Sequence, residues 1–460
     1  MGKRLTVFLS IATLLLVWQL TAVFVAQPEI FPSLPRLLTT LIELVCSASF
    51  YLSVGTTVLR GLAGMGLSLS LALLFAGVFA RWEWLYELFR PLFILMRSIP
   101  VVSFILLALI FLHTEGIPLL IGFLTMFPLL TENLTRGFQS LDPGLRMAGR
   151  QFRLSRRNRF TQIVYPQLKP FLFSGVASAA GFGWRAIIMG EVLAQCATGI
   201  GSEMKWAQSF IDVPGLLAWT LIAVVISYLS DKGIQWLSKR EIRVAYRPAK
   251  HPAEEMKVTN GLPIEADHLS YPYGVAGFTY RFDAGKIYGI SAPSGTGKTT
   301  LLNLLNGTLL PVEGTLTIDR SEGVASVFQE PLLLSHLTVR ENISLVIAPY
   351  YSREEAEAKA DIFLRHVELH DYASSLPAQL SYGQQQRVAI ARALAYPSPF
   401  LFMDEPFKGL DRPLCQRLII YLRQRQEETQ QTVLFTSHQA DELSSLADTV
   451  VTLNANLATR

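Results

Sequence analysis

Long apolar segments are confined to the first half of the chain, while the second half has an ordinary mixture of polar and apolar residues. Six apolar segments with few charges are separated by polar stretches, and they cover residues 5–26, 61–79, 92–112, 117–130, 171–193 and 216–236. A helix of about 20 apolar residues spans the hydrocarbon core of a bilayer. The pattern therefore predicts an all-α membrane domain over residues 1–238, with about six transmembrane helices.

The first apolar segment follows Lys3 and Arg4, an arrangement that also begins secretory signal peptides. The segment is long enough to cross a bilayer, and no small-residue cleavage motif follows it. We therefore expect it to be the first transmembrane helix.

Basic residues in the polar connections predict the orientation of the membrane domain. The connection over residues 136–169 holds eight basic residues and one acid, Asp142. Cytoplasmic connections carry an excess of Lys and Arg, so this one is expected in the cytoplasm together with both chain termini. The pattern over residues 146–162 predicts a short helix or two, closed by Tyr165 and Pro166. The connection is either a topology signal or lipid contact, or a helix that docks onto a cytoplasmic domain.

Composition narrows the function classes. Half of the residues are hydrophobic and only 17% are charged, which excludes an ordinary soluble protein, and the formal charge of +4 gives no reason to expect a nucleic-acid partner. Cys46, Cys196 and Cys415 have no metal-ligand spacing; the first two are either free thiols or a disulfide on the outer side. The charged, proline-containing residues 239–263 predict a linker to a second domain over residues 264–460.

The second domain contains a phosphate-binding loop. A strand-like run at 286–290 leads into SAPSGTGKTT, in which Gly295 and Gly297 free the backbone N–H groups to face phosphate oxygens. Lys298 would place a cation near the β- and γ-phosphates, Thr299 would offer a hydroxyl to Mg²⁺, and Ala292 stands where glycine is commoner. The predicted ATP contacts in this loop are Ser294, Gly295, Thr296, Gly297, Lys298, Thr299 and Thr300.

Two acids follow an apolar strand about a hundred residues after this loop, in the sequence PFLFMDEP. This order predicts that Asp404 holds Mg²⁺ and that Glu405 polarises the attacking water as general base. Tyr273, in the sequence LSYPYG, is the candidate to stack on adenine, and Tyr271 is its competitor.

The sequence LSYGQQQR at residues 380–387 resembles the signature sequence of ABC ATPases, and the resemblance covers residues 264–460. In that family the signature contacts the γ-phosphate bound by the opposite subunit, although here Tyr382 replaces the usual first glycine. The resemblance implies an α/β P-loop fold with a helical subdomain between residues 329 and 381. The signature contacts that it implies are Ser381, Gly383 and Gln384.

Three further residues match motifs of the same family. Gln329 falls in the Q-loop, which senses Mg²⁺; Asp411 falls in the D-loop; and His438 falls at the switch histidine, which contacts the γ-phosphate. The resemblance therefore implies Glu405, His438 and Gln329 as the catalytic group, with Thr299, Gln329 and Asp404 around the metal.

The membrane half resembles the nitrate/sulfonate/taurine branch of binding-protein-dependent importer permeases, of the type I architecture. The stretch LDPGLRMAGRQFRLSRRNRFTQIVYPQLKP is similar to their coupling loop, and TTVLRGLAG, RPLFILMRSIP, GWRAIIMGEVL and GIGSEM are similar to other parts. Aligned on Pro166, the family's Glu-Ala-Ala falls on Met147, Ala148 and Gly149, and its glycine falls on Arg153. The acid and the glycine are thus both absent.

Charged residues inside membrane segments are costly and usually functional. They are either part of the solute pathway or gate, or they pair between helices or reach the helix ends. The candidates are Arg60, Arg97, Arg185 and Glu191.

Together these motifs predict a homodimeric transport ATPase of the cytoplasmic membrane that uses ATP and Mg²⁺. It would import a small anionic solute delivered by a separate extracytoplasmic binding protein. Alternatives are an importer of a vitamin precursor of the pyrimidine/thiamine or riboflavin type, an exporter, or a membrane-anchored ATPase without cargo.

Overall fold

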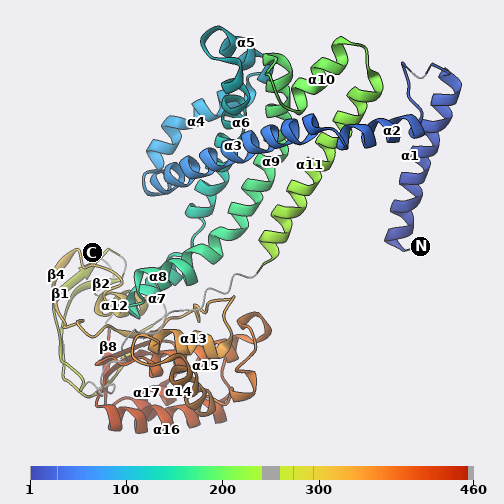
Figure 1. Ribbon diagram of the computed structural model, residues 1–460. Helices are drawn as coiled ribbons and strands as arrows, with labels where there is room; N and C mark the ends of the chain where they lie inside the picture. The colour runs from blue at the N-terminus through green and yellow to red at the C-terminus, as the bar shows by residue number, and fades with distance from the viewer. Residues whose placement is uncertain (1, 28, 241–259, 273, 294, 454–460) are drawn as a thin grey trace. The chain divides into compact units, whose positions relative to one another are not determined.

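The computed structural model describes residues 2–27, 29–240, 260–272, 274–293 and 295–453. The chain divides into two compact units, which are described separately (Figure 1). The helical unit comprises Met1–Leu141 and Gln167–Ile242, and the α/β unit comprises Asp142–Pro166 and Arg243–Arg460. The basic connection between two membrane helices thus belongs to the unit that carries the P-loop.

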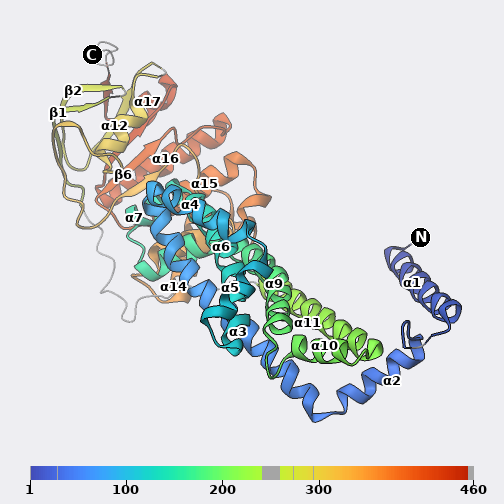
Figure 2. The ribbon, with the colours of Figure 1, turned by 90° about the horizontal axis from the view of Figure 1, so that it is seen from above.

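The helical unit is built from long apolar helices. α3 and α6 pack along one another, α10 packs on α11, and α1 joins the others through α2 (Figure 2). The unit contains α1 (Lys3–Val25), α2 (Leu34–Val45), α3 (Ala48–Arg81), α4 (Glu83–Ser98), α5 (Val101–Phe111), η1 (Thr114–Gly116), α6 (Ile117–Gln139), α9 (Tyr165–Ala194, which begins in the α/β unit), α10 (Ile200–Ser209) and α11 (Val213–Lys239).

Five helices among the described residues are long and apolar enough to cross a membrane, and α4 with α5 make a sixth candidate if this bent pair is one span. This agrees with the expected number of about six. The single helix expected over residues 92–112 is wrong, because the chain bends by 95° between α4 and α5. Pro100 lacks an N–H group and forces Ile99 into an extended conformation (φ −71°, ψ 130°), which ends α4.

The α/β unit holds two sheets. An antiparallel sheet has the order β2-β1-β4, and a parallel sheet has the order β5-β6-β7-β3-β8. The strands are β1 (Ile264–Tyr271), β2 (Val275–Phe282), β3 (Ile287–Ser291), β4 (Glu313–Thr317), β5 (Ala325–Val327), β6 (Phe400–Asp404), β7 (Thr432–Thr436) and β8 (Thr449–Thr452). Every residue of β6 and β7 is buried, as apolar strands inside a parallel sheet must be. Ligands bind at the carboxyl edge of such sheets, where β3, β6 and β7 end side by side.

Helices surround the parallel sheet, and two of them fill the stretch between Gln329 and Ser381 where a helical subdomain was expected. These two are α13 (Val339–Ile347) and α14 (Arg353–His366). The others are α12 (Lys298–Leu305), α15 (Tyr382–Ala395), α16 (Arg412–Thr429) and α17 (Ala440–Leu446), with short turns η3 (His370–Tyr372) and η4 (Pro377–Gln379).

The basic connection forms α7 (Pro143–Gln151), α8 (Arg156–Arg159) and the π-helical turn η2 (Phe160–Val164). A helix or two was expected here, but the prediction that Tyr165 and Pro166 close it is wrong. The helical backbone runs on into α9, because proline is tolerated in a first helical turn. All three cysteines are free, so the disulfide alternative is not realised. Most of the expected linker, residues 241–259, lies outside the described residues.

Candidate nucleotide site

The phosphate loop connects β3 to α12. Gly295 (φ +80°) and Gly297 (φ +91°) adopt left-handed conformations that favour glycine, and α12 begins directly afterwards at Lys298. A Cβ atom on Gly274 would lie 2.6 Å from the Cα of Gly297, so the turn between β1 and β2 packs directly against this loop. The unpaired N–H groups at the start of α12 and the glycine backbone together form a cradle for an anion.

Two predicted acids lie at the end of β6, next to β7. The carboxylate Oδ1 of Asp404 accepts a hydrogen bond of 2.6 Å from the Thr436 hydroxyl, whose oxygen accepts the N–H of Glu405 at 3.0 Å. Glu405 has a left-handed backbone (φ +47°), which is costly for a non-glycine residue and recurs at functional sites. One threonine therefore fixes both acids.

Glu405 faces a histidine and a lysine. Its Oε1 lies 3.0 Å from His438 Nε2, and its Oε2 lies 3.5 Å from Lys408 Nζ. On the other side of the imidazole ring, His438 Nδ1 lies 3.3 Å from Lys298 Nζ. The sequence therefore brings Glu405, His438 and Lys298 together although they come from three different loops.

Lys298 is the buried cation of the site. Its ammonium donates to the carbonyl oxygens of Ala292 (2.6 Å) and Pro293 (3.3 Å), and among the described residues it forms no ion pair with a carboxylate. Burial lowers its pKa, and the negative charges of Glu405 and Asp404 only partly oppose this shift. A second negative partner, such as a phosphate, fits this environment.

These groups surround a cavity of about 510 Å³. Its lining contains eight of the residues predicted to bind nucleotide or act in catalysis: Gly295, Gly297, Lys298, Thr299, Thr300, Gln329, Glu405 and His438. The glycine cradle, the buried ammonium and the hydroxyl groups fit the phosphate chain of ATP. Thr299, Gln329 and Asp404 offer the oxygen ligands that suit Mg²⁺, which usually takes few protein ligands beside phosphates.

Several predicted residues lie elsewhere. Thr296 belongs to the loop, where its hydroxyl donates to Pro293 O at 2.6 Å, and Asp404 is buried at the end of β6 and does not line the cavity. Tyr273 and Ser294 lie outside the described residues. The family-derived residues Ser381, Gly383, Gln384 and Asp411 do not line this cavity.

The signature residues sit at the amino end of α15. Ser381 caps this helix: its hydroxyl oxygen accepts the Gln384 N–H at 3.3 Å, and the Gln384 side chain accepts the Ser381 N–H at 2.8 Å. The hydroxyl hydrogen of Ser381 has no acceptor among the described residues. The amino end of α15 thus presents a hydroxyl donor and a positive dipole end, as an anion site requires.

Three contacts near the site were not expected from the sequence. Thr436 fixes both acids, Gly274 packs on the phosphate loop, and the Tyr382 hydroxyl donates to the main-chain oxygen of Gln329 at 2.7 Å. Thr436 ends β7 two residues before His438, so its place at the end of a strand was the available signal. The Tyr382 contact depends on two segments that only the fold brings together.

Comparison with known families divides the chain in the same two parts. Residues 64–243 match the "Binding-protein-dependent transport system inner membrane component", and residues 275–408 match "ABC transporter". Thiamine import ATP-binding protein ThiQ from Shigella flexneri is 36% identical over 187 residues, which cover 38% of this chain and 81% of the relative. ThiQ from Vibrio cholerae is 35% identical over 201 residues, which cover 41% and 84%. The chain belongs to the ABC transporter family.

The transporter joins the permease and the ATPase of an importer in one polypeptide that passes through the membrane several times and couples ATP hydrolysis to transport. Among solved structures, a dimeric post-hydrolysis ATP-binding cassette, MJ0796 with ADP and Pi, is 29% identical. The match covers 43% of this transporter and 97% of that chain, with a TM-score of 0.40.

The basic connection of the transporter packs into its α/β unit. Ala148, Phe152, Leu154 and Ile163 are buried within the hydrophobic core of that unit. The Phe152 ring meets the Tyr396 ring edge-on at 5.4 Å. A Cβ atom on Gly149 would overlap the Ile163 side chain, so the small residue lets α7 lie against η2.

Arg392 also contacts the packed connection. Its guanidinium lies 5.1 Å from the centre of the Phe152 ring and donates to the main-chain oxygens of Leu332 (2.8 Å) and Pro331 (3.1 Å). Because the side chain is buried, its pKa falls to about 10, which leaves it charged at neutral pH. The docking contact therefore rests on a buried cation as well as on apolar surface.

Arg153 occupies the position on which the resemblance to importer permeases places a glycine. Its backbone is left-handed (φ +48°), the conformation that glycine adopts without steric cost. Its guanidinium donates to Ser321 O of the α/β unit. The substitution therefore exchanges an unstrained backbone for an additional hydrogen bond to the ATPase.

Three of the four charged candidates in the membrane helices pair between helices. Arg60 contacts Glu115 and lies 2.8 Å from Glu191, which is fully buried; Arg97 contacts Glu132. Arg185 forms no hydrogen bond or ion pair with any described residue. The pairing alternative holds for Arg60, Glu191 and Arg97, and only Arg185 stays a candidate for the solute path.

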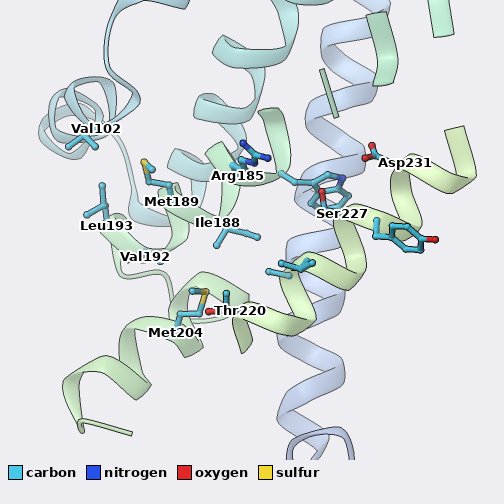
Figure 3. Close-up of a pocket in the computed structure, with 14 residues that line it drawn as sticks. Val102, Arg185, Ile188, Met189, Val192, Leu193, Met204, Thr220, Ser227 and Asp231 are labelled. Carbon is cyan, nitrogen blue, oxygen red and sulfur yellow. The ribbon is translucent and has the colours of Figure 1, made fainter. Parts of the chain in front are cut away.

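Arg185 lines a cavity of about 760 Å³ in the helical unit, between α5, α9, α10 and α11 (Figure 3). Most of the lining is apolar, with Ile188, Met189 and Met204 among its side chains. Asp231, from α11, lies on the same cavity.

Proposed function

We propose that two copies of this chain form an importer that carries a small anionic solute across the cytoplasmic membrane. The permease match names a binding-protein-dependent system, which supports a separate extracytoplasmic protein that delivers the solute. The resemblance of several sequence stretches to nitrate, sulfonate and taurine permeases and the arginine on the membrane cavity support an anionic solute. The proposed domains remain the permease over residues 1–238, the linker over 239–263 and the ATPase over 264–460.

The position of the signature residues supports the proposed homodimer. Ser381, Gly383 and Gln384 form an anion-binding helix start that does not line the cavity of their own P-loop. A second copy, related by a two-fold axis, would bring its signature to that cavity and receive the first copy's signature in return. Two identical sites then complete each other.

Within each site, the chain's residues divide the work of hydrolysis. Glu405 accepts the proton of the attacking water, and His438, 3.0 Å away, holds this carboxylate and reaches toward the γ-phosphate. Lys298 and the glycine backbone bind the phosphates. Thr299, Gln329 and Asp404 would hold Mg²⁺, which neutralises charge on the phosphates.

The basic connection shares a hydrophobic core with the ATPase, and this supports a role in coupling ATP hydrolysis to transport. Phe152 and its neighbours are packed into the ATPase, and the chain continues from η2 into the membrane helix α9 without a break. Movement of the ATPase on ATP binding therefore pulls directly on a membrane helix. We infer that this connection is the coupling element of the transporter.

Thiamine is the second candidate solute. The similar ATP-binding proteins named above serve thiamine import, and this agrees with the alternative of a vitamin-precursor importer. Those relatives are ATP-binding proteins, however, and they match only 38% and 41% of this chain. Uptake of labelled taurine and labelled thiamine by cells that express the transporter with its neighbouring binding protein distinguishes the two.

Complementation between two inactive variants tests the homodimer. Lys298→Ala removes the P-loop cation and Ser381→Arg blocks the signature, so each variant alone should hydrolyse almost no ATP. Coexpression should restore roughly a quarter of the wild-type rate, because random pairing makes half of the dimers mixed and each mixed dimer keeps one intact site. The absence of any recovery, with mixed dimers shown by two affinity tags, would refute the proposal.

A further inference from the structure

The membrane arginines of this transporter differ in one respect, which is whether an acid neutralises them. The Arg60 guanidinium is bound by Glu115, Glu191 and the main-chain oxygen of Thr198. Arg97 is paired with Glu132. An unpaired arginine in a membrane helix costs about 3 kcal/mol even on the most lenient scale, so such residues face water or a ligand.

Arg185 has no such partner among the described residues. It lies nine residues before the end of α9 at Ala194, about 14 Å along the helix axis, and is therefore not at a helix end. Its side chain is exposed and lines the 760 Å³ cavity shown in Figure 3. Neither an ion pair nor a position at the helix end accounts for this charge.

The opposite wall of the cavity carries a polar stripe. Thr220, Ser227 and Asp231 are spaced by seven and four residues, which places them on one face of α11, and all three line the cavity. Asp231 also has no hydrogen bond or ion pair within the described residues, and it is more than 4 Å from any basic nitrogen there. It lies eight residues, or about 12 Å, before the end of α11.

Among the described residues, the cavity thus offers one unpaired cation and one unpaired anion, with the hydroxyl groups of Thr220 and Ser227, on a mostly apolar surface. From this geometry we infer that the cavity binds the transported solute and selects small zwitterions. The anionic group binds Arg185, the cationic group binds Asp231, and Met189, Met204 and Trp184 contact the carbon skeleton. The inference rests on the proposed function and narrows its anionic solute to one that also carries a cationic group.

The size and the chemistry of the cavity agree with this assignment. Its volume falls in the usual range for small-molecule sites, which are mostly apolar with a few polar groups that fix orientation. An acyl chain would leave both charges unsatisfied. A solute with two opposite charges satisfies both of them and adds no net charge to the membrane interior.

Cysteine labelling tests whether the cavity holds water and a positive field. Ser227→Cys is made in the full-length transporter with Cys46, Cys196 and Cys415 replaced by serine, and the protein is placed in lipid nanodiscs. A cysteine in water reacts with charged methanethiosulfonates. We compare the labelling rate of the anionic sulfonatoethyl reagent with that of the cationic trimethylammonium reagent. The ratio of these two rates should be several-fold higher with Arg185 present than in the Arg185→Gln background. Labelling by neither reagent would show a lipid-filled or partner-covered face and overturn the inference.

Protection experiments with defined probes test the solute class. Taurine carries a sulfonate and an ammonium, and isethionate replaces the ammonium by a hydroxyl. We expect taurine to protect the cysteine at the lower concentration, Arg185→Gln to weaken protection by both probes about tenfold or more, and Asp231→Asn to remove the difference between them. Arg185→Lys should recover part of the protection.

Arg90→Gln is the matched control, because Arg90 is an exposed arginine of α4 that does not line the cavity. Protection by thiamine that survives Arg185→Gln would overturn the zwitterion assignment. If the complementation of Lys298→Ala by Ser381→Arg succeeds while protection fails, only this inference falls. If protection holds while complementation fails, the site stands and the homodimer falls.

Discussion

The two units of this transporter place their charged residues in different ways. In the α/β unit the charges that matter follow strand ends: Asp404 and Glu405 follow β6, and His438 follows β7. In the helical unit the charges lie within helices, and their roles depend on neighbours in other helices. Three of four candidates there are neutralised, and of the four Arg185 alone faces a cavity without a partner among the described residues. The order of motifs along the chain predicts function where strand ends bring residues together at a sheet edge. It does not predict function where charged residues pair between helices.

The largest expected effect concerns the sheet edge. Glu405→Gln should lower ATP hydrolysis about 10²–10⁴-fold, because the general base is lost, while nucleotide binding persists. Turnover by the purified transporter and binding of a fluorescent ATP analogue measure the two effects. Lys408→Gln is the control, since Lys408 is an exposed partner of Glu405 at 3.5 Å and should change turnover far less. Near-normal hydrolysis in Glu405→Gln would show that Glu405 is not the general base and that its contact with His438 is only structural.

In the helical unit we expect an effect of comparable free energy, but on stability rather than on turnover. Glu191 is fully buried and accepts hydrogen bonds from Thr57, Gly201 N and Arg60. Glu191→Ala would leave the Arg60 charge without its buried partner, which costs about 3–5 kcal/mol, and thermal unfolding in detergent should show the loss. Glu87→Ala breaks an exposed pair and should cost less than about 1 kcal/mol. Normal stability with lost uptake in Glu191→Ala would return this residue to the solute path.

The contact between connection and ATPase should give a smaller effect on coupling. Phe152→Ala removes a ring that is 2% exposed and packed between Tyr396 and Arg392. Truncation of a buried phenylalanine costs about 3–5 kcal/mol, only part of which falls on docking in the assembled transporter. We expect more ATP hydrolysed per solute imported, measured in proteoliposomes. Arg157→Gln, an exposed neighbour, should leave this ratio unchanged, and an unchanged ratio in Phe152→Ala would argue against the coupling role.

The smallest expected effect concerns Glu442, a buried carboxylate in the α/β unit that we compare with Glu191. Among the described residues, Glu442 accepts hydrogen bonds from the Ser437 hydroxyl and the Cys415 thiol but pairs with no cation, and burial raises its pKa above 4.5. As pH rises above 4.5 the unfolded chain loses this proton before the folded chain does, so Glu442 makes folding less favourable toward neutral pH. Glu442→Gln stays neutral, and its melting temperature should exceed that of the wild type by a margin that grows as the pH rises above 4.5, the range in which the unfolded chain ionises first. A constant margin would contradict this assignment.

Much of the nucleotide site could be predicted because its residues follow strands in a fixed order. Gly295, Lys298, Glu405 and His438 were expected together, and they line one cavity. Thr436 was missed, since a threonine at a strand end carries no chemical signature until the neighbouring strand is known. Tyr382 was noted only as a departure, and its bond to the Gln329 carbonyl requires the folded subdomain.

In the membrane half, apolar length predicted the helices but not the break at Pro100, because a hydropathy pattern does not register the loss of one N–H group. The departure at Arg153 likewise had no interpretation until its left-handed backbone and its bond to Ser321 were seen.

By itself the sequence determined the two-part architecture and the chemistry of the phosphate loop, and it predicted a cytoplasmic side for the basic connection. These depend on local properties: the length of apolar runs, the sign of nearby charges and the conformational freedom of glycine. Only the tertiary structure decided which membrane charges are neutralised and that the connection packs into the ATPase core. Both depend on distances between segments that are far apart in the chain, 35 residues for Arg97 and Glu132 and 131 for Arg60 and Glu191, and chain order alone does not set those distances.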